Sequence, residues 1–80
     1  MATHEVVSPL PGTFYRKPAP DAPVFVGEGD RVKAGDVIGL VEVMKTFNEV
    51  HADADGTIAR FLVDNEDAVE AGQPLLARDV

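Results

Sequence analysis

The residues best suited to chemistry in this chain are a methionine and a lysine near its middle, within the stretch VEVMKTFNEV at residues 41–50. The runs on either side read as β-strands, so Met44 and Lys45 fall where a hairpin needs its turn. Two-residue hairpin turns favour Asn-Gly or Asp-Gly, because those residues adopt positive φ at little cost. Met-Lys is a poor choice for the turn alone, and a broken local rule marks a candidate for function.

A lysine at a hairpin tip can serve as a modification site. Its ammonium is reachable, and its long stem swings freely above a rigid scaffold. Most turn lysines are only solvated charges, but the exposed methionine beside Lys45 argues against that simpler explanation. Acylation of this amine would remove one positive charge.

A second constellation is HADAD at residues 51–55, which contains His51, Asp53 and Asp55. Strand alternation predicts all three on one face, an arrangement that could serve a small metal-binding protein or hydrolase. One histidine with two aspartates and no identifiable pocket is more typical of solvated polar alternation, so we expect no metal site. The acidic segment DNEDAVE (residues 64–70) also lacks the spacing of a calcium loop.

Composition limits the remaining function classes. The 80 residues are enough for one domain, residues 1–80, and the net charge of −7 argues against nucleic acid or an anionic membrane as a partner. The absence of cysteine fits a reducing compartment, and neither a secretory signal nor a membrane-spanning run is recognisable. We therefore expect a cytoplasmic location.

The chain repeats itself with one difference between its halves. GTFYR at residues 12–16 returns as GTIAR 44 residues later, whereas VKAGDVI at residues 32–38 returns as VEAGQPL 37 residues later. The first half therefore holds seven extra residues between the two elements. Proline suits a strand interior poorly, so the extra segment is best assigned to KPAPDAP. Its residues are Lys17, Pro18, Ala19, Pro20, Asp21, Ala22 and Pro23.

The repeat predicts an all-β fold with quasi-two-fold symmetry. We expect a flattened barrel or sandwich of two small antiparallel sheets, with the lysine on a hairpin tip. The expected strands are the short apolar or alternating runs separated by Gly, Asp and Asn turns. These runs are TFYR, VFVG, DVIGLVEV, TFNEVHA, TIARFLV and PLLARDV.

The stretch EVMKTFN, with GTFYRKPAPDAP before it and DGTI and AGQPL after it, resembles the biotinyl domain of biotin carboxyl carrier proteins, most closely the acetyl-CoA carboxylase type. The resemblance extends from about Ser8 to Leu76 and implies a biotinyl/lipoyl-like fold. It also implies that biotin is attached to Lys45. A biotin protein ligase would read Glu42, Val43 and Met44, where Val43 replaces the usual alanine, and residues 17–23 would form a thumb near the biotin.

The resemblance implies a carrier and not an enzyme. A biotin carboxylase would load the biotin with a carboxyl group, and a carboxyltransferase would pass that group to an acyl-CoA, with acetyl-CoA expected. One alternative is a lipoyl carrier, although such carriers usually have an acidic residue before the lysine and alanine after it, unlike Met44 and Thr46. An unmodified interaction module is another, besides the metal-binding alternative.

Overall fold

The fold is built from strands alone in the part of the chain that the computed structural model describes, residues 3–79. Residues 3–79 contain no helix, and therefore no helix that is long and apolar enough to cross a membrane. The strands are β1 (Thr3–Val7), β2 (Gly12–Tyr15), β3 (Arg31–Val32), β4 (Val37–Val43), β5 (Thr46–His51), β6 (Gly56–Phe61), β7 (Ala68–Val69) and β8 (Pro74–Asp79).

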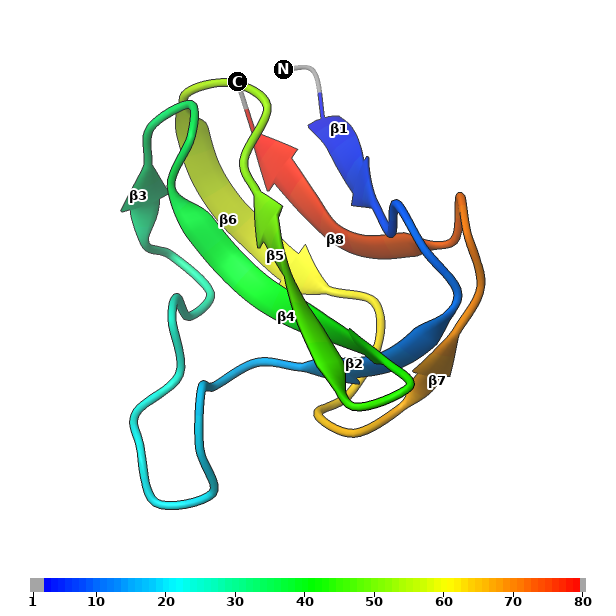
Figure 1. Ribbon diagram of the computed structural model, residues 1–80. Coiled ribbons are helices and arrows are strands. Elements are labelled where there is room, and N and C mark those ends of the chain that lie inside the picture. The colour runs from blue at the N-terminus through cyan, green and yellow to red at the C-terminus, as the bar shows by residue number, and fades with distance from the viewer. Residues whose placement is uncertain (1–2, 80) are drawn as a thin grey trace.

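The strands form two antiparallel four-stranded sheets that lie face to face (Figure 1). One sheet has the order β1-β8-β6-β3, and the other has the order β5-β4-β2-β7. All strand pairs are antiparallel. The expected all-β architecture of two small sheets is therefore confirmed.

The two sheets have equivalent strand orders, as the sequence repeat requires. The repeat relates β2 to β6, β3 to β7 and β4 to β8, and the matching positions at the sheet edges relate β5 to β1. A tight hairpin joins β4 to β5, whereas the equivalent strands β8 and β1 pair without a hairpin between them. The Met-Lys turn thus corresponds to the region between the last residue of β8 and the first residue of β1.

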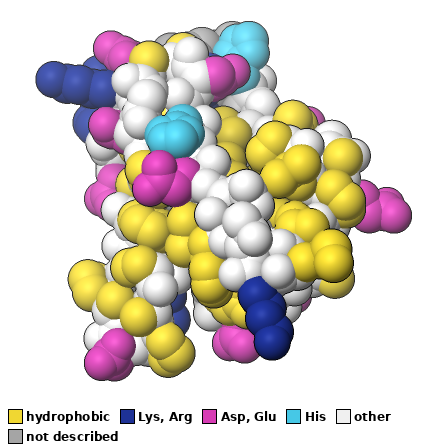
Figure 2. Space-filling view, viewed as in Figure 1, with side chains coloured by type: hydrophobic (Ala, Val, Ile, Leu, Met, Phe, Trp, Pro, Cys, Tyr) yellow, Lys and Arg dark blue, Asp and Glu magenta, His cyan; other side chains and the backbone are white. Residues whose placement is uncertain are grey.

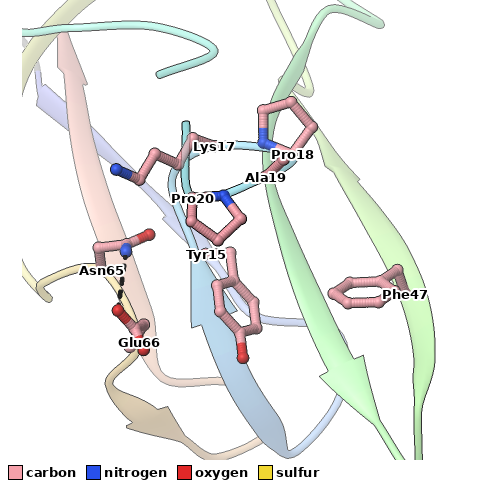
Figure 3. A pocket seen from close by; sticks show the side chains of 8 residues that line it. All are labelled: Tyr15, Lys17, Pro18, Ala19, Pro20, Phe47, Asn65 and Glu66. Carbon is pink, nitrogen blue, oxygen red and sulfur yellow. Dashed lines mark hydrogen bonds between the residues drawn. The ribbon is translucent and has the colours of Figure 1, made fainter. Parts of the chain in front are cut away.

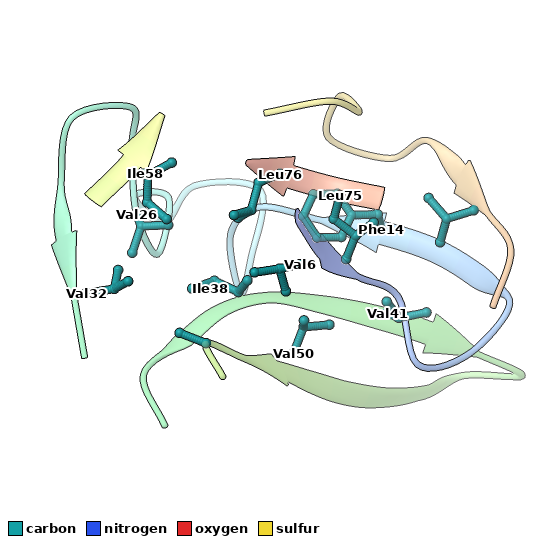
Figure 4. Packing of buried hydrophobic residues seen from close by; sticks show 12 residues of the cluster. Val6, Phe14, Val26, Val32, Ile38, Val41, Val50, Ile58, Leu75 and Leu76 are labelled. Carbon is teal, nitrogen blue, oxygen red and sulfur yellow. The ribbon is translucent and has the colours of Figure 1, made fainter. Parts of the chain in front are cut away.

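An apolar layer between the sheets holds them together (Figure 4). Phe14, Ile38, Val41, Leu75 and Leu76 are completely buried, and they come from both sheets. Such burial is the main favourable contribution to folding in a domain of this size. The buried cluster comprises Val6, Phe14, Val26, Val32, Ile38, Val41, Val50, Ala52, Ile58, Val69, Leu75 and Leu76.

The glycine that opens each repeat is required by close backbone packing. A Cβ atom added to Gly12 would collide with the carbonyl oxygen of Glu42, and one added to Gly56 would collide with that of Asp79. These carbonyl groups belong to the neighbouring strands β4 and β8, which cannot retreat without breaking their sheets. The repeated Gly-Thr dipeptide therefore reflects a backbone contact present twice in the fold.

Two expectations about the strands are wrong. VFVG at residues 24–27 forms no strand, because Val26 enters the core from a loop, and the edge position is taken by β3. HADAD is not extended throughout, since β5 ends at His51 and Asp53 and Asp55 lie beyond it. The structure also adds β1, which the sequence did not predict.

Residues 17–23 form a loop that projects from the sheets (Figure 1). The Phe25 amide donates to the Arg16 carbonyl oxygen at 2.8 Å and closes the base of the loop, and an Ala22–Ala19 bond of 3.1 Å forms a turn within it. None of the seven residues is buried. The proline-rich insertion is therefore an excursion from the sheets and contributes nothing to the core.

We predict that Gly56→Ala lowers the free energy of unfolding by about 2 kcal/mol, because the added methyl group must displace the backbone of β8. Gly27→Ala is the matched control: its nearest neighbour would be the Asp30 carboxylate at 3.8 Å, so a change within about 0.5 kcal/mol is expected. Urea denaturation measures both. Equal effects at the two positions would contradict the proposed backbone contact.

Candidate functional site

The Met44-Lys45 pair forms the two-residue turn of the β4–β5 hairpin. Val43 pairs with Thr46 across the strands, and the φ angles of Met44 and Lys45 are 50° and 67°. Positive φ at both central residues matches a type I′ turn, whose twist suits a β-hairpin. A side chain in this left-handed region costs roughly 1–2 kcal/mol per residue. The rest of the fold must offset this strain, which is a recurrent property of functional positions.

Both side chains at the tip face solvent. Met44 is 92% exposed, and Lys45 is exposed as well. Within residues 3–79 the Lys45 side chain takes part in no hydrogen bond or ion pair. The tip lies at the opposite end of the molecule from the paired chain ends (Figure 1). The Lys45 amine is therefore accessible to a large partner.

The residues below the tip hold the hairpin against β2. The Tyr15 hydroxyl donates a hydrogen bond to Glu42 Oε1 at 3.1 Å, and the Tyr15 and Phe47 ring centroids lie 5.9 Å apart with the rings tilted by 56°. The Glu42 carboxylate raises the pKa of Tyr15, chiefly through this hydrogen bond, with smaller effects from burial and from the Glu66 charge. Tyr15 thus remains a neutral hydrogen-bond donor.

The three residues that precede Lys45 point to different environments. Glu42 is half-buried on the outer face of the sheet, where it meets Tyr15. Val43 is half-buried and packs against the core cluster from the inner face. Met44 begins the exposed turn. The alternation of β4 therefore anchors Glu42 and Val43 and leaves only Met44 and Lys45 free to meet a partner.

A pocket of about 320 Å³ lies beside the hairpin, between the projecting loop and the outer face of the sheet. Loop residues 17–20 form one wall, and Tyr15, Phe47, Asn65 and Glu66 form the rest (Figure 3). In the space-filling view an open cleft separates the loop from the hairpin (Figure 2). The volume is at the lower end of the range for small-molecule sites, about 300–1,000 Å³.

The HADAD residues have separate partners. Asp53 pairs with the Arg78 guanidinium, Asp55 accepts a hydrogen bond from the Ala34 amide at 2.8 Å, and His51 lies 3.3 Å from Glu49. Arg78 is only 3% exposed, and its hydrogen bond holds the pKa of Asp53 below the ordinary value. No group of residues suited to a metal ion is found within residues 3–79. The structure therefore does not gather His51, Asp53 and Asp55 into one set of metal ligands.

The sequence did not identify the pocket. Tyr15, Phe47, Asn65 and Glu66 come from three separate segments, and only the folding of the sheets brings them together. One available signal pointed to Glu66. Gly29 in the first half of the repeat corresponds to Glu66, 37 residues later, in the second half. A glutamate at a position where the other half has glycine indicates a role for its side chain.

Comparison with known proteins identifies the family. Residues 4–77 match the model of the family described as "Biotin-requiring enzyme". The chain is 49% identical over 72 residues to the biotin carboxyl carrier protein of acetyl-CoA carboxylase from Nostoc sp., which covers 90% of this chain and 40% of the relative. The protein of the same description from Haemophilus influenzae is 43% identical over 76 residues, which covers 95% of this chain and 49% of the relative.

Solved structures show the same architecture. A single-chain, multi-domain long-chain acyl-CoA carboxylase superposes with a TM-score of 0.79 at 25% identity, over 95% of this chain and 7% of that one. The urea carboxylase of Kluyveromyces lactis also gives 0.79, at 30% identity over 99% of this chain and 6% of that one. The chain therefore belongs to the biotin-requiring family. The chain spans less than half the length of the Nostoc and Haemophilus influenzae relatives.

We predict that the double variant Met44→Asn, Lys45→Gly raises the free energy of unfolding by about 1 kcal/mol, because both new residues adopt positive φ more easily. Thr46→Gly, at the first residue of β5, is the control and should lower stability, since glycine is unfavourable within a strand. Thermal unfolding followed by circular dichroism checks both. A less stable double variant would show that the native turn is not strained.

Proposed function

We propose that Lys45 is the residue that bears biotin, and that the chain carries a carboxyl group on it from a biotin carboxylase to a carboxyltransferase. The observation that carries this proposal is the exposed, strained Met44-Lys45 turn at the tip of a rigid hairpin. Tethering a reactive group to a mobile domain raises its effective concentration at each active site that the domain visits. The carrier needs no acid, base or metal of its own for this task.

The chemistry of Lys45 fits covalent biotin. Its primary amine can form an amide with the biotin carboxyl group, and its four-carbon stem extends the reach of the attached ring. The attached biotin would supply a ureido nitrogen that accepts and releases the carboxyl group. The residues around Lys45 would orient the arm and keep it accessible.

We propose that a biotin protein ligase recognises Glu42, Val43 and Met44 together with the turn. The firm anchorage of Glu42 by Tyr15 and of Val43 by the core supports this proposal, because a ligase must find the lysine in a constant position. The 92% exposure of Met44 leaves a large apolar side chain for the ligase to bury. Valine in place of alanine at Val43 preserves an apolar contact with the core.

We propose that residues 17–23 act as a thumb that contacts the biotin ring between visits to the two enzymes. The position of the loop beside the pocket supports this role, since the pocket lies within reach of the same hairpin that presents Lys45. Prolines in the thumb wall reduce the entropy lost on binding, because they restrict the free loop.

The names of the relatives support acetyl-CoA carboxylase as the setting, with acetyl-CoA as the acceptor of the carboxyl group. The partners of this chain would then be the biotin protein ligase, the biotin carboxylase and the carboxyltransferase, and the chain would meet them in the cytoplasm. In this proposal residues 1–80 act as one carrier domain. Neither a nucleic acid nor a membrane is proposed as a partner, given the net charge of −7.

The direct test is the intact mass of the chain coexpressed with a biotin protein ligase in the presence of biotin. We expect one biotinyl adduct in the wild type and none in Lys45→Arg, with equal melting temperatures, because the tip is solvated. Lys33→Arg, at another exposed lysine, is the matched control and should keep the adduct. An unmodified wild-type chain beside a modified known carrier would favour the lipoyl carrier or the interaction module.

We predict that replacing residues 17–23 with two glycines changes the free energy of unfolding by less than about 1 kcal/mol, because the removed residues are unburied and a shorter loop loses less entropy on closure. Val26→Ala is the contrasting control: it truncates a buried side chain just beyond the loop and should cost about 2 kcal/mol. Urea denaturation separates the two. Unfolding of the loop variant would show that the thumb is part of the core fold.

A further inference from the structure

Glu66 occupies a backbone conformation that favours glycine. Its φ is 72°, while Gly29, its counterpart in the other half of the repeat, has a φ of 91°. The two positions make equivalent backbone bonds: the Glu66 amide donates to the Phe14 carbonyl oxygen at 2.6 Å, and the Gly29 amide donates to that of Ile58 at 2.8 Å. The turn therefore forms equally well with glycine, and the glutamate side chain needs a separate explanation.

Asn65 fixes the position of this turn relative to the projecting loop. Its side-chain Oδ1 accepts a hydrogen bond from the Arg16 amide at 2.8 Å, at the base of the loop. Its Nδ2 points to Glu66 Oε2 at 3.5 Å, the long end of the hydrogen-bond range (Figure 3). The Asn65 side chain thus links the base of the loop to the Glu66 carboxylate. Asn65 and Glu66 both line the pocket.

The pocket presents an acceptor and a donor above an aromatic floor. The Glu66 carboxylate can accept hydrogen bonds, and the Lys17 ammonium can only donate them. The Tyr15 and Phe47 rings supply apolar surface between the projecting loop and the hairpin (Figure 3). No ion pair joins Lys17 to Glu66 among the described residues, so each charge is available to an occupant.

We propose that Glu66 and Lys17 together bind the ureido group of the biotin attached to Lys45, with Glu66 accepting from a ureido N–H and Lys17 donating to the ureido oxygen. This inference rests on the proposed function of Lys45. It assigns ring binding to a residue outside the 17–23 thumb, at a site where the equivalent turn has glycine. Glu66 is a specificity-determining residue for the docked ring.

The covalent arm can reach this site. Phe47 lines the pocket and lies two residues after Lys45, a separation of about 7 Å along an extended strand. Lysine and the biotin side chain together are much longer than this separation, so the arm can fold back along the outer face of β5. The tilted Tyr15 and Phe47 rings would then cover the apolar part of the biotin ring.

The test is nuclear magnetic resonance of the full chain with and without biotin on Lys45, with mass spectrometry to confirm attachment. Biotin should shift the amide signals of Ala19 and Glu66 in the wild type, because these residues line the pocket and lie outside the hairpin that bears the attachment site. In Glu66→Gly the docking equilibrium should weaken about fivefold, as for the loss of one hydrogen bond, while the melting temperature stays equal or rises because strain is removed. Lys17→Met should weaken docking in the same way.

Asp64→Asn is the matched control, because it removes one negative charge from the same loop at a residue that does not line the pocket. It should leave the biotin-induced shifts unchanged. If biotin is attached to Lys45 and the shifts at the pocket are as large in Glu66→Gly as in the wild type, or are absent from the wild type, the inference is wrong and the carrier function stands. If no biotin is attached, the proposed function itself fails.

Discussion

The structure depends on apolar contact between two four-stranded sheets. β4 contributes Ile38 and Val41 to this contact, and Val43 packs at its margin. Because β4 is held from its inner face, the turn that follows it can carry two residues in an unfavourable backbone conformation. The exposed Lys45 is therefore positioned by burial elsewhere in the domain, although its own side chain makes no stabilising bond among the described residues.

The quasi-two-fold repeat separates structural requirements from functional ones. Gly12 and Gly56 are glycine in both halves because each faces a neighbouring backbone at the same kind of contact. Three of the differences between the halves are the Met-Lys turn, the insertion at residues 17–23 and Glu66, which matches Gly29. All three differences lie around one pocket and one hairpin. The repeat thus accounts for shared backbone contacts, and these three differences lie at the candidate site.

Charged residues contribute in two distinct ways. Asp53 compensates the buried Arg78 guanidinium, and an unpaired charge at that depth would be costly. Glu66 and Lys17 lack such a partner within the described residues and face the pocket instead. The same residue types thus stabilise the sheet in one place and remain available for binding in the other, according to what surrounds them.

The sequence by itself determined the two-sheet architecture, the hairpin at Met44-Lys45 and the projecting loop, because repeats, alternation and turn chemistry are local patterns. It misassigned VFVG as a strand and extended HADAD beyond His51, because edge pairing and core insertion depend on neighbours distant in sequence. Only the tertiary structure decided that Tyr15, Phe47, Asn65 and Glu66 share a pocket with the loop. Their meeting follows from sheet packing, which no local pattern encodes.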